Sequence, residues 1–182
     1  MFRKIISWFT ASGASAPESP QVPAATHAGR PAAADAVAPG TEIHHAANLI
    51  PKLKDDHRRL LELFGRIKQA HAAGQTAQAA ALLAVFRNGL QEHLLVESVR
   101  LYVYLEHSAR NDPERFELVH HFRHEMGAIG KAAVAFLARY ADLANDPQLA
   151  STFGADLDAV GGVLVERIQR EEGVLYPMYE AA

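Results

Sequence analysis

Four stretches of the chain repeat apolar residues at alternating steps of three and four, the spacing that places side chains on one face of an α-helix. Gly74, Asn111-Asp112-Pro113 and Asn145-Asp146-Pro147 separate the stretches and are typical helix-ending signals. The expected helices run from 41 to before 74, over 76–108, from 113 to before 145, and from 147 onward. No useful length alternates with a period of two, so no strand is expected. The pattern predicts an all-α, antiparallel up-down-up-down four-helix bundle.

The first 40 residues have a different composition. Residues 1–9 (MFRKIISWF) carry apolar side chains at helical spacing, which suits either a weak membrane or partner anchor or a frayed terminus. Residues 10–40 are mostly Ala, Pro, Ser and Gly, and they hold too little apolar surface to offset the entropy of ordering. We therefore predict a disordered N-terminal tail over residues 1–40 and a bundle domain over residues 41–182.

Composition excludes several classes of function. A chain of 182 residues with 49% hydrophobic residues can bury one good core. Its net charge of -3 gives no general attraction to nucleic acid, and the absence of cysteine excludes thiolate metal sites and thiol nucleophiles. No apolar run approaches the roughly 18 residues of a membrane span. A cytoplasmic protein is expected, with peripheral membrane association through residues 1–9 as the alternative.

Two runs near the ends of the second and fourth helices share one pattern. In residues 93–103, His93 precedes Glu97 by four positions; in residues 167–177, Arg167 precedes Glu171 in the same way. Leu-Tyr follows at the same distance in both runs. Residues four apart share a helix face, so each run can turn a nitrogen and a carboxylate inward together. His57 lies inside the apolar stripe of the first helix. These residues predict one buried polar site.

The third helix is expected to contribute no polar group to this site. Its core stripe is unbroken: Val119, Phe122, Met126, Ile129, Ala133, Phe136 and Tyr140. His120 and His124 form an HxxxH pair that points roughly opposite to this stripe, so we expect both to be solvated. Only a bulge that shifted the helix phase would turn them inward. The surface is also the expected place of His44, His45, His71, His107 and His121.

Two buried carboxylates cost several kcal/mol each unless positive charge or hydrogen bonds compensate them. A first-row divalent metal held by imidazoles and carboxylates is one solution, and iron(II), manganese and zinc all suit such donors. Its ligands would be His57, His93, Glu97 and Glu171. The other solution is Arg167 alone, whose guanidinium can bridge carboxylates without a metal. Tyr102 and Tyr176 are expected to pack, with donation to the carboxylates as the alternative.

These residues resemble the hemerythrin-like (HHE) four-helix-bundle family over about residues 43–179. The similarity lies in Asp56-His57, in His93xxxGlu97, and in the run Glu171-Glu172-Gly-Val-Leu-Tyr-Pro177. The resemblance implies a non-haem di-iron centre and proteins that bind oxygen, sense oxygen or nitric oxide, or handle iron. Carried over, it makes ligands of His57, His93, Glu97 and Glu171, with the two glutamates bridging the metals.

This chain departs from the family pattern at three positions. The resemblance implies histidine on the core stripe of the third helix, where this chain has Phe122 and Met126, and in the fourth helix, where it has Arg167. All three departures remove ligands from the same iron and spare its neighbour. We hypothesise a half-site that keeps one metal, with the cation of Arg167 between the same two carboxylates in place of the second; one or two ions remain the alternatives.

Two classes of function follow. With metal, the domain is expected to be a sensor or carrier that responds to oxygen, nitric oxide or iron. It is not expected to be an enzyme, since no nucleophile or acid-base pair with a substrate cleft stands out. Without metal, it would be a regulatory bundle that binds a protein partner. In that direction the RxxxE of the last helix is similar to that of bacterial anti-sigma regulators of the principal sigma factor.

Overall fold

The computed structural model describes residue 37 and residues 42–182. The expectations for residues 1–36 and 38–41, including the anchor, most of the tail and a helix start at Thr41, lie outside the described residues. Val37 forms an isolated antiparallel bridge with His44. Within the described part of the chain, no helix is both long and apolar enough to cross a membrane.

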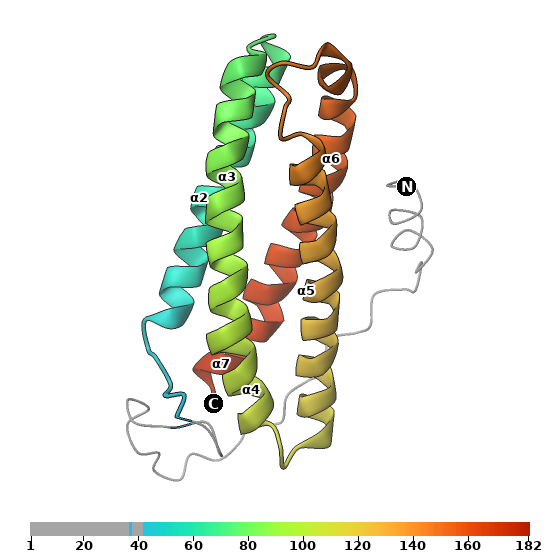
Figure 1. Cartoon of the computed structure of the whole chain (residues 1–182). Helices are drawn as coiled ribbons and strands as arrows, with labels where there is room; N and C mark the ends of the chain where they lie inside the picture. The colour runs from blue at the N-terminus through green and yellow to red at the C-terminus, as the bar shows by residue number, and fades with distance from the viewer. Residues whose placement is uncertain (1–36, 38–41) are drawn as a thin grey trace. The chain divides into compact units, whose positions relative to one another are not determined.

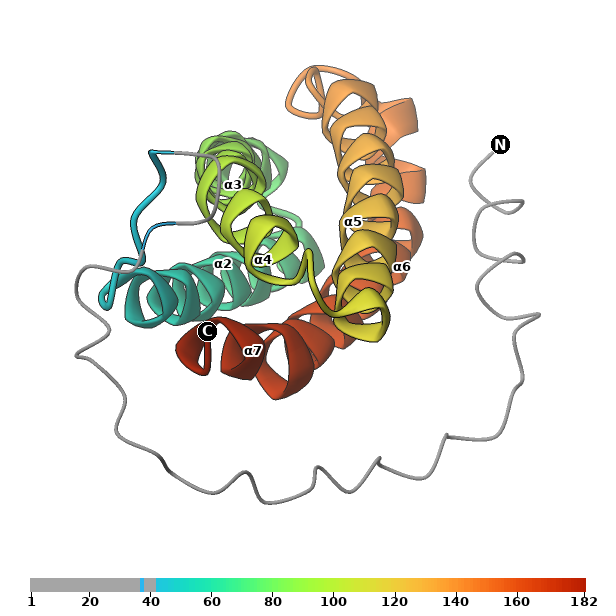
Figure 2. The same cartoon turned by 90° about the horizontal axis from the view of Figure 1, so that it is seen from below.

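The described chain folds into four helical rods without a strand, which confirms the predicted fold class (Figure 1). Each rod runs back alongside the one before it, and an end-on view shows the four rods around a shared core (Figure 2). The first rod is α2 (Leu49–Ala72) and the third is α5 (Pro113–Arg139). The second and fourth rods each contain a π-helical segment: α3 (Thr76–Val96), η2 (Glu97–Leu101) and α4 (Tyr102–Ser108); then α6 (Pro147–Arg170), η3 (Glu171–Leu175) and α7 (Tyr176–Glu180).

The predicted helix boundaries are confirmed at the two proline signals. Asp112 caps α5 by accepting a hydrogen bond from the backbone N–H of Arg115, and Asp146 caps α6 in the same way from Gln148. Pro113 and Pro147 follow directly, at positions where a missing N–H has no intrahelical partner to lose. Gly74 has a φ of 69°, in the left-handed region that glycine adopts without strain.

The first helix starts later than expected, at Leu49. Pro51 explains this start, because proline is tolerated in the first turn of a helix and would break its interior. The residues before the helix bind the end of the chain instead: the N–H of Ala46 donates to the hydroxyl of Tyr179 at 2.8 Å. His45 stacks on Tyr179 and is buried, so its expected surface position was wrong.

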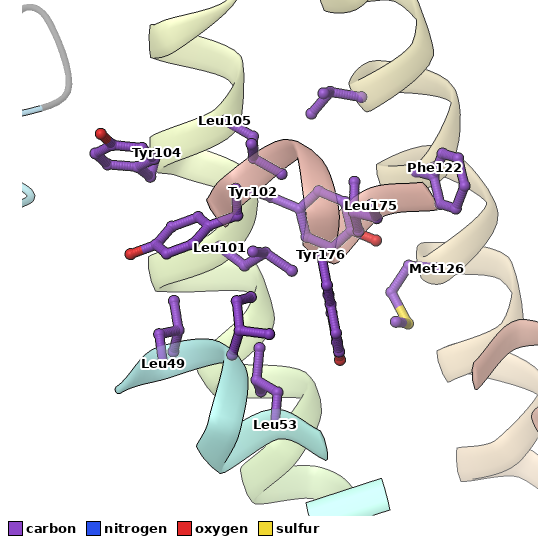
Figure 3. Packing of buried hydrophobic residues seen from close by; sticks show 13 residues of the cluster. Leu49, Leu53, Leu101, Tyr102, Tyr104, Leu105, Phe122, Met126, Leu175 and Tyr176 are labelled. Atoms are coloured by element: carbon purple, nitrogen blue, oxygen red, sulfur yellow. The ribbon is translucent and has the colours of Figure 1, made fainter. Parts of the chain in front are cut away.

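The core follows the predicted stripes. Every member of the third-helix stripe from Val119 to Tyr140 is buried. In the second helix, Leu83, Phe86 and Leu90 are buried, whereas Leu82 is only partly buried. At the lower end of the bundle, Leu101, Tyr102, Leu175 and Tyr176 pack with residues of α2 and α5 (Figure 3). This cluster closes the bundle below the polar site.

Candidate metal centre

Three rods bring together four side chains of the kinds that can bind a metal ion. His57 comes from α2, His93 from α3, Glu97 from η2 and Glu171 from η3, and one donor atom of each lies within 4.8 Å of all the others. All four residues are buried, and none is more than 3% exposed. The convergence that the sequence predicted is therefore present, from the same four residues.

The two π-helical segments position the walls of this site. The N–H of Tyr102 bonds to the carbonyl of Glu97, and the N–H of Tyr176 bonds to that of Glu171, five residues back in both cases. In a regular α-helix a residue five positions on is rotated by about 140°. A five-residue bond instead brings it nearly above its partner, so glutamate and tyrosine both face the core. The sequence prediction missed these segments.

Pro177 is the residue from which η3 could have been predicted. Proline in a helix interior removes one backbone hydrogen bond and crowds the carbonyl four residues earlier, and a wider turn relieves that crowding. η3 ends two residues before Pro177. Val103 occupies the matching position in the second rod, where no such signal exists. Only the shared spacing of residues 93–103 and 167–177 indicated that both rods would contain the same irregular turn.

The two imidazole rings are tilted by 57° to each other, with their centres 4.6 Å apart. Nε2 of His57 lies 3.1 Å from Nε2 of His93. The other ring nitrogen of His57, Nδ1, lies 2.8 Å from Oε1 of Glu172. A carboxylate in that position accepts a hydrogen bond from Nδ1–H and leaves the Nε2 lone pair directed into the site, as is common for metal-binding histidines. Glu172 was not assigned a role from sequence, although its place directly after Glu171 was visible.

The two carboxylates have different partners. Glu171 accepts a hydrogen bond from Nε of Arg167 at 2.6 Å, and its second oxygen lies 3.4 Å from Nε2 of His57. Glu97 accepts from the hydroxyl of Tyr176 at 2.9 Å. The other oxygen of Glu97 is buried without a hydrogen-bond partner, 3.6 Å from Nε2 of His93. The expectation that Tyr176 only packs was thus wrong, because it donates to the site.

Arg167 binds one oxygen of Glu171, and His57 lies near the other. Besides Glu171, its guanidinium donates to Oε2 of Glu125 at 3.2 Å and to the hydroxyl of Tyr102, and it stacks 4.9 Å from the ring centre of Phe122. These bonds do not link the two site carboxylates directly. Glu125 was missed because it follows the outward-facing His124 in sequence. The Arg167 and Glu171 pair that resembles anti-sigma regulators is enclosed in the bundle.

The third helix directs its histidines away from this site. His120, His121 and His124 are all exposed, as predicted. Phe122 and Met126 occupy the inward positions and belong to the core cluster. No bulge shifts the phase of α5, which runs unbroken from Pro113 to Arg139.

Burial and neighbouring charges shift the pKa values of the groups in the site in different directions. Burial disfavours the imidazolium of His57, yet the carboxylates of Glu171 and Glu172 outweigh it and raise its pKa. Burial, aided by His57, lowers the pKa of His93 to about 4. Burial and the neighbouring Glu171 raise the pKa of Glu97. Without a metal, the site therefore resists holding two carboxylates as anions.

The donor set fits a first-row metal ion. Ligands about 2.0–2.2 Å from a metal lie about 3 Å apart when adjacent and about 4 Å apart when opposite. The separations between donor atoms of 3.1, 3.4 and 3.6 Å fall in this range. The unpartnered oxygen of Glu97 and the opposed imidazole nitrogens are groups that a cation would satisfy.

The fold and this site agree with a comparison against family models. The hemerythrin HHE cation-binding domain matches residues 48–179, which is most of the chain. The protein therefore belongs to the hemerythrin HHE cation-binding domain family, a class of four-helix bundles that bind metal cations. No curated protein and no solved structure gives a significant match.

Proposed function

We propose that this bundle binds a single iron ion through His57, His93, Glu97 and Glu171, and acts as a sensor or carrier of oxygen or nitric oxide. The observation that carries the proposal is the convergence of these four buried donors, one of which, Oε2 of Glu97, has no other partner. A metal-free network would leave that oxygen unsatisfied in the core, which is costly.

Arg167 supports one metal rather than two. A second ion would need ligands from the third and fourth helices, where Phe122, Met126 and Arg167 stand. The guanidinium already supplies a positive charge 2.6 Å from Oε1 of Glu171, the oxygen that does not contact His57. Two imidazoles and two carboxylates remain for one ion, and this set suits iron(II), with manganese and zinc as alternatives.

A small apolar cavity supports a small neutral ligand. It has a volume of about 40 Å³, and about 10–15 Å³ on this measure is enough to hold one water molecule. His57, His93 and Glu171 lie on its wall, and the rest is mostly apolar: Leu60, Leu61, Phe64, Phe86, Leu90, Leu94, Met126, Ile129, Gly130, Ala133, Gly161, Leu164, Val165 and Ile168, with Arg167. When bound, iron would supply open coordination positions for oxygen or nitric oxide beside this cavity. The protein groups hold the ion and limit access by water, so we propose binding rather than catalysis.

Metal content per chain tests the proposal directly. The protein would be purified without chelators, and iron, manganese and zinc measured by elemental analysis; metal-free protein would then be titrated with ferrous iron under nitrogen. We expect saturation at one iron per chain and a spectral change when air or nitric oxide is admitted. Two irons per chain would contradict the half-site. A protein that takes up no metal would leave a helical module for binding a protein partner as the better proposal.

A further inference from the structure

The two tyrosines of the twin runs have different partners. Both Tyr102 and Tyr176 follow their glutamate by five residues, and both are fully buried. The hydroxyl of Tyr102 accepts a hydrogen bond from the guanidinium of Arg167. The hydroxyl of Tyr176 instead lies between two of the proposed ligands, Glu97 and His57. Tyr176 thus directs its oxygen to the metal site, and Tyr102 directs its oxygen to the cation beside it.

The position of the Tyr176 oxygen matches that of a ligand. It lies 3.2 Å from Nε2 of His57, the separation of adjacent donors around one ion. It also lies 2.9 Å from Oε1 of Glu97, next to Oε2, the oxygen of that carboxylate without a hydrogen-bond partner. The rings of Tyr176 and His57 stack nearly parallel, at 11°, with their centres 5.6 Å apart. Because π-helical η3 brings Tyr176 to the face of Glu171, this placement depends on the irregular turn.

We propose that Tyr176 is a further ligand of the bound metal, giving a phenolate oxygen to iron in its ferric state. This inference rests on the proposed function. On coordination the O–H bond of Tyr176 breaks, its proton passes to solvent, and an oxygen–iron bond forms without a change in the oxidation state of the iron. Glu97, Glu171 and Tyr176 then supply three negative charges, which match a ferric ion better than a ferrous one. Tyrosinate is a known ligand of ferric iron in proteins.

The experiment compares three proteins loaded with ferric iron: wild type, Tyr176→Phe and Tyr102→Phe. A ferric phenolate absorbs visible light through charge transfer, and excitation in that band enhances ring vibrations of the bound tyrosine in the Raman spectrum. We expect the band and the ring vibrations in wild type and Tyr102→Phe, and their loss in Tyr176→Phe at equal iron content. Tyr102→Phe is the matched control, because it removes a hydroxyl that is equally buried but bonded to Arg167.

The outcomes separate this inference from the proposed function. Iron-loaded wild type without phenolate vibrations, or an unchanged band in Tyr176→Phe, would overturn the ligand role alone. Wild type that takes up no iron would overturn both. If Tyr176→Phe does not fold, wild type and Tyr102→Phe decide the question, and ring vibrations must appear in both. Their loss in Tyr102→Phe would show that Tyr102, and not Tyr176, is the ligand.

Discussion

Arg167 and Glu171 are one helical turn apart on the fourth rod, and Nε of the arginine lies 2.6 Å from the carboxylate. His93 and Glu97 have the same spacing on the second rod, but their closest atoms are 3.6 Å apart and the carboxylate oxygen has no hydrogen-bond partner. Arg167 and Glu171 are therefore hydrogen-bonded to each other, whereas His93 and Glu97 are not. This contrast places the proposed metal nearer His93 than Arg167.

Arg167 should be essential for the stability of the metal-free protein. Replacing it in Arg167→Gln leaves Glu171 buried beside Glu97 without a cation, and removing one partner of a buried pair costs about 3–5 kcal/mol. We expect a loss of that size in the free energy of unfolding, measured by urea denaturation at neutral pH. Arg170→Gln is the control: Arg170 also binds Glu125 and stacks on Phe122, but it is partly exposed. Its loss should cost less than about 1 kcal/mol, and equal losses would contradict this view of Arg167.

Glu97→Gln should separate metal binding from folding. Burial and the charge of Glu171 raise the pKa of Glu97, so a neutral amide of the same shape should leave the metal-free protein at least as stable. Removing a direct ligand should weaken iron binding by more than the roughly 10- to 100-fold expected for losing the hydrogen-bond partner of a ligand.

Glu172→Gln gives that smaller loss as the matched control, since Glu172 contacts only the outer nitrogen of His57 among the proposed ligands. Calorimetric titration with ferrous iron under nitrogen measures both variants. Tight iron binding by Glu97→Gln, or its unfolding without metal, would show that Glu97 has a purely structural role.

His93 should make the stability of the metal-free protein fall in mild acid. Its pKa is about 4 in the folded chain against 6.5 when exposed. The unfolded chain therefore takes up the proton first, and the contribution of His93 is lost as pH falls from 6.5 towards 4. His57 has a raised pKa, so its contribution is present below 6.5 and is lost as pH rises above that value.

Urea unfolding at pH 4.5 and 6.5 tests the loss of stability that we expect from His93. The stability difference between these pH values should shrink in His93→Gln by an amount on the order of 2 kcal/mol. His124→Gln, at an exposed position, should behave like the wild type. Parallel pH curves for wild type and His93→Gln would contradict the lowered pKa of His93.

Adjacent glycines test the packing around the cavity. A Cβ at Gly161 would overlap the ring of Phe64, whereas a Cβ at Gly162 meets nothing within 4 Å. Gly161→Ala should force the ring to move and cost about 1–3 kcal/mol. Gly162→Ala should raise stability by as much as about 1 kcal/mol, because alanine favours the helix. Thermal melting compares the two, and similar Tm values would mean that Phe64 moves freely.

Much of the fold and of the site composition could be predicted because helical periodicity is a local property. The stripe from Val119 to Tyr140 and the inward positions of His57, His93, Glu97 and Glu171 follow from counting steps of three and four. The same counting placed His120 and His124 outside. Membership in the hemerythrin HHE family was visible for the same reason, since its motifs are defined by spacing along helices.

What sequence could not supply depends on contacts between distant segments. The burial of His45 follows from its stacking on Tyr179, a residue 134 positions away. The place of Glu125 depends on how α5 meets Arg167 of α6. The donation by Tyr176 required a π-helical turn, which regular helix geometry does not predict. A partner on another segment thus determined the positions of His45 and Glu125, and an irregular helical turn determined that of Tyr176.

The hydrogen bond between His57 and Glu172 connects the buried centre to the surface of the protein. His57 is almost completely enclosed, while the side chain of Glu172 is 36% exposed and only 2.8 Å away. A single hydrogen bond therefore separates a proposed ligand from a carboxylate in contact with water. Ionic strength, or a partner that covers Glu172, would change the electron density on His57 without entering the bundle. The centre is enclosed by the core, but the charge of a surface carboxylate acts directly on one of its proposed ligands.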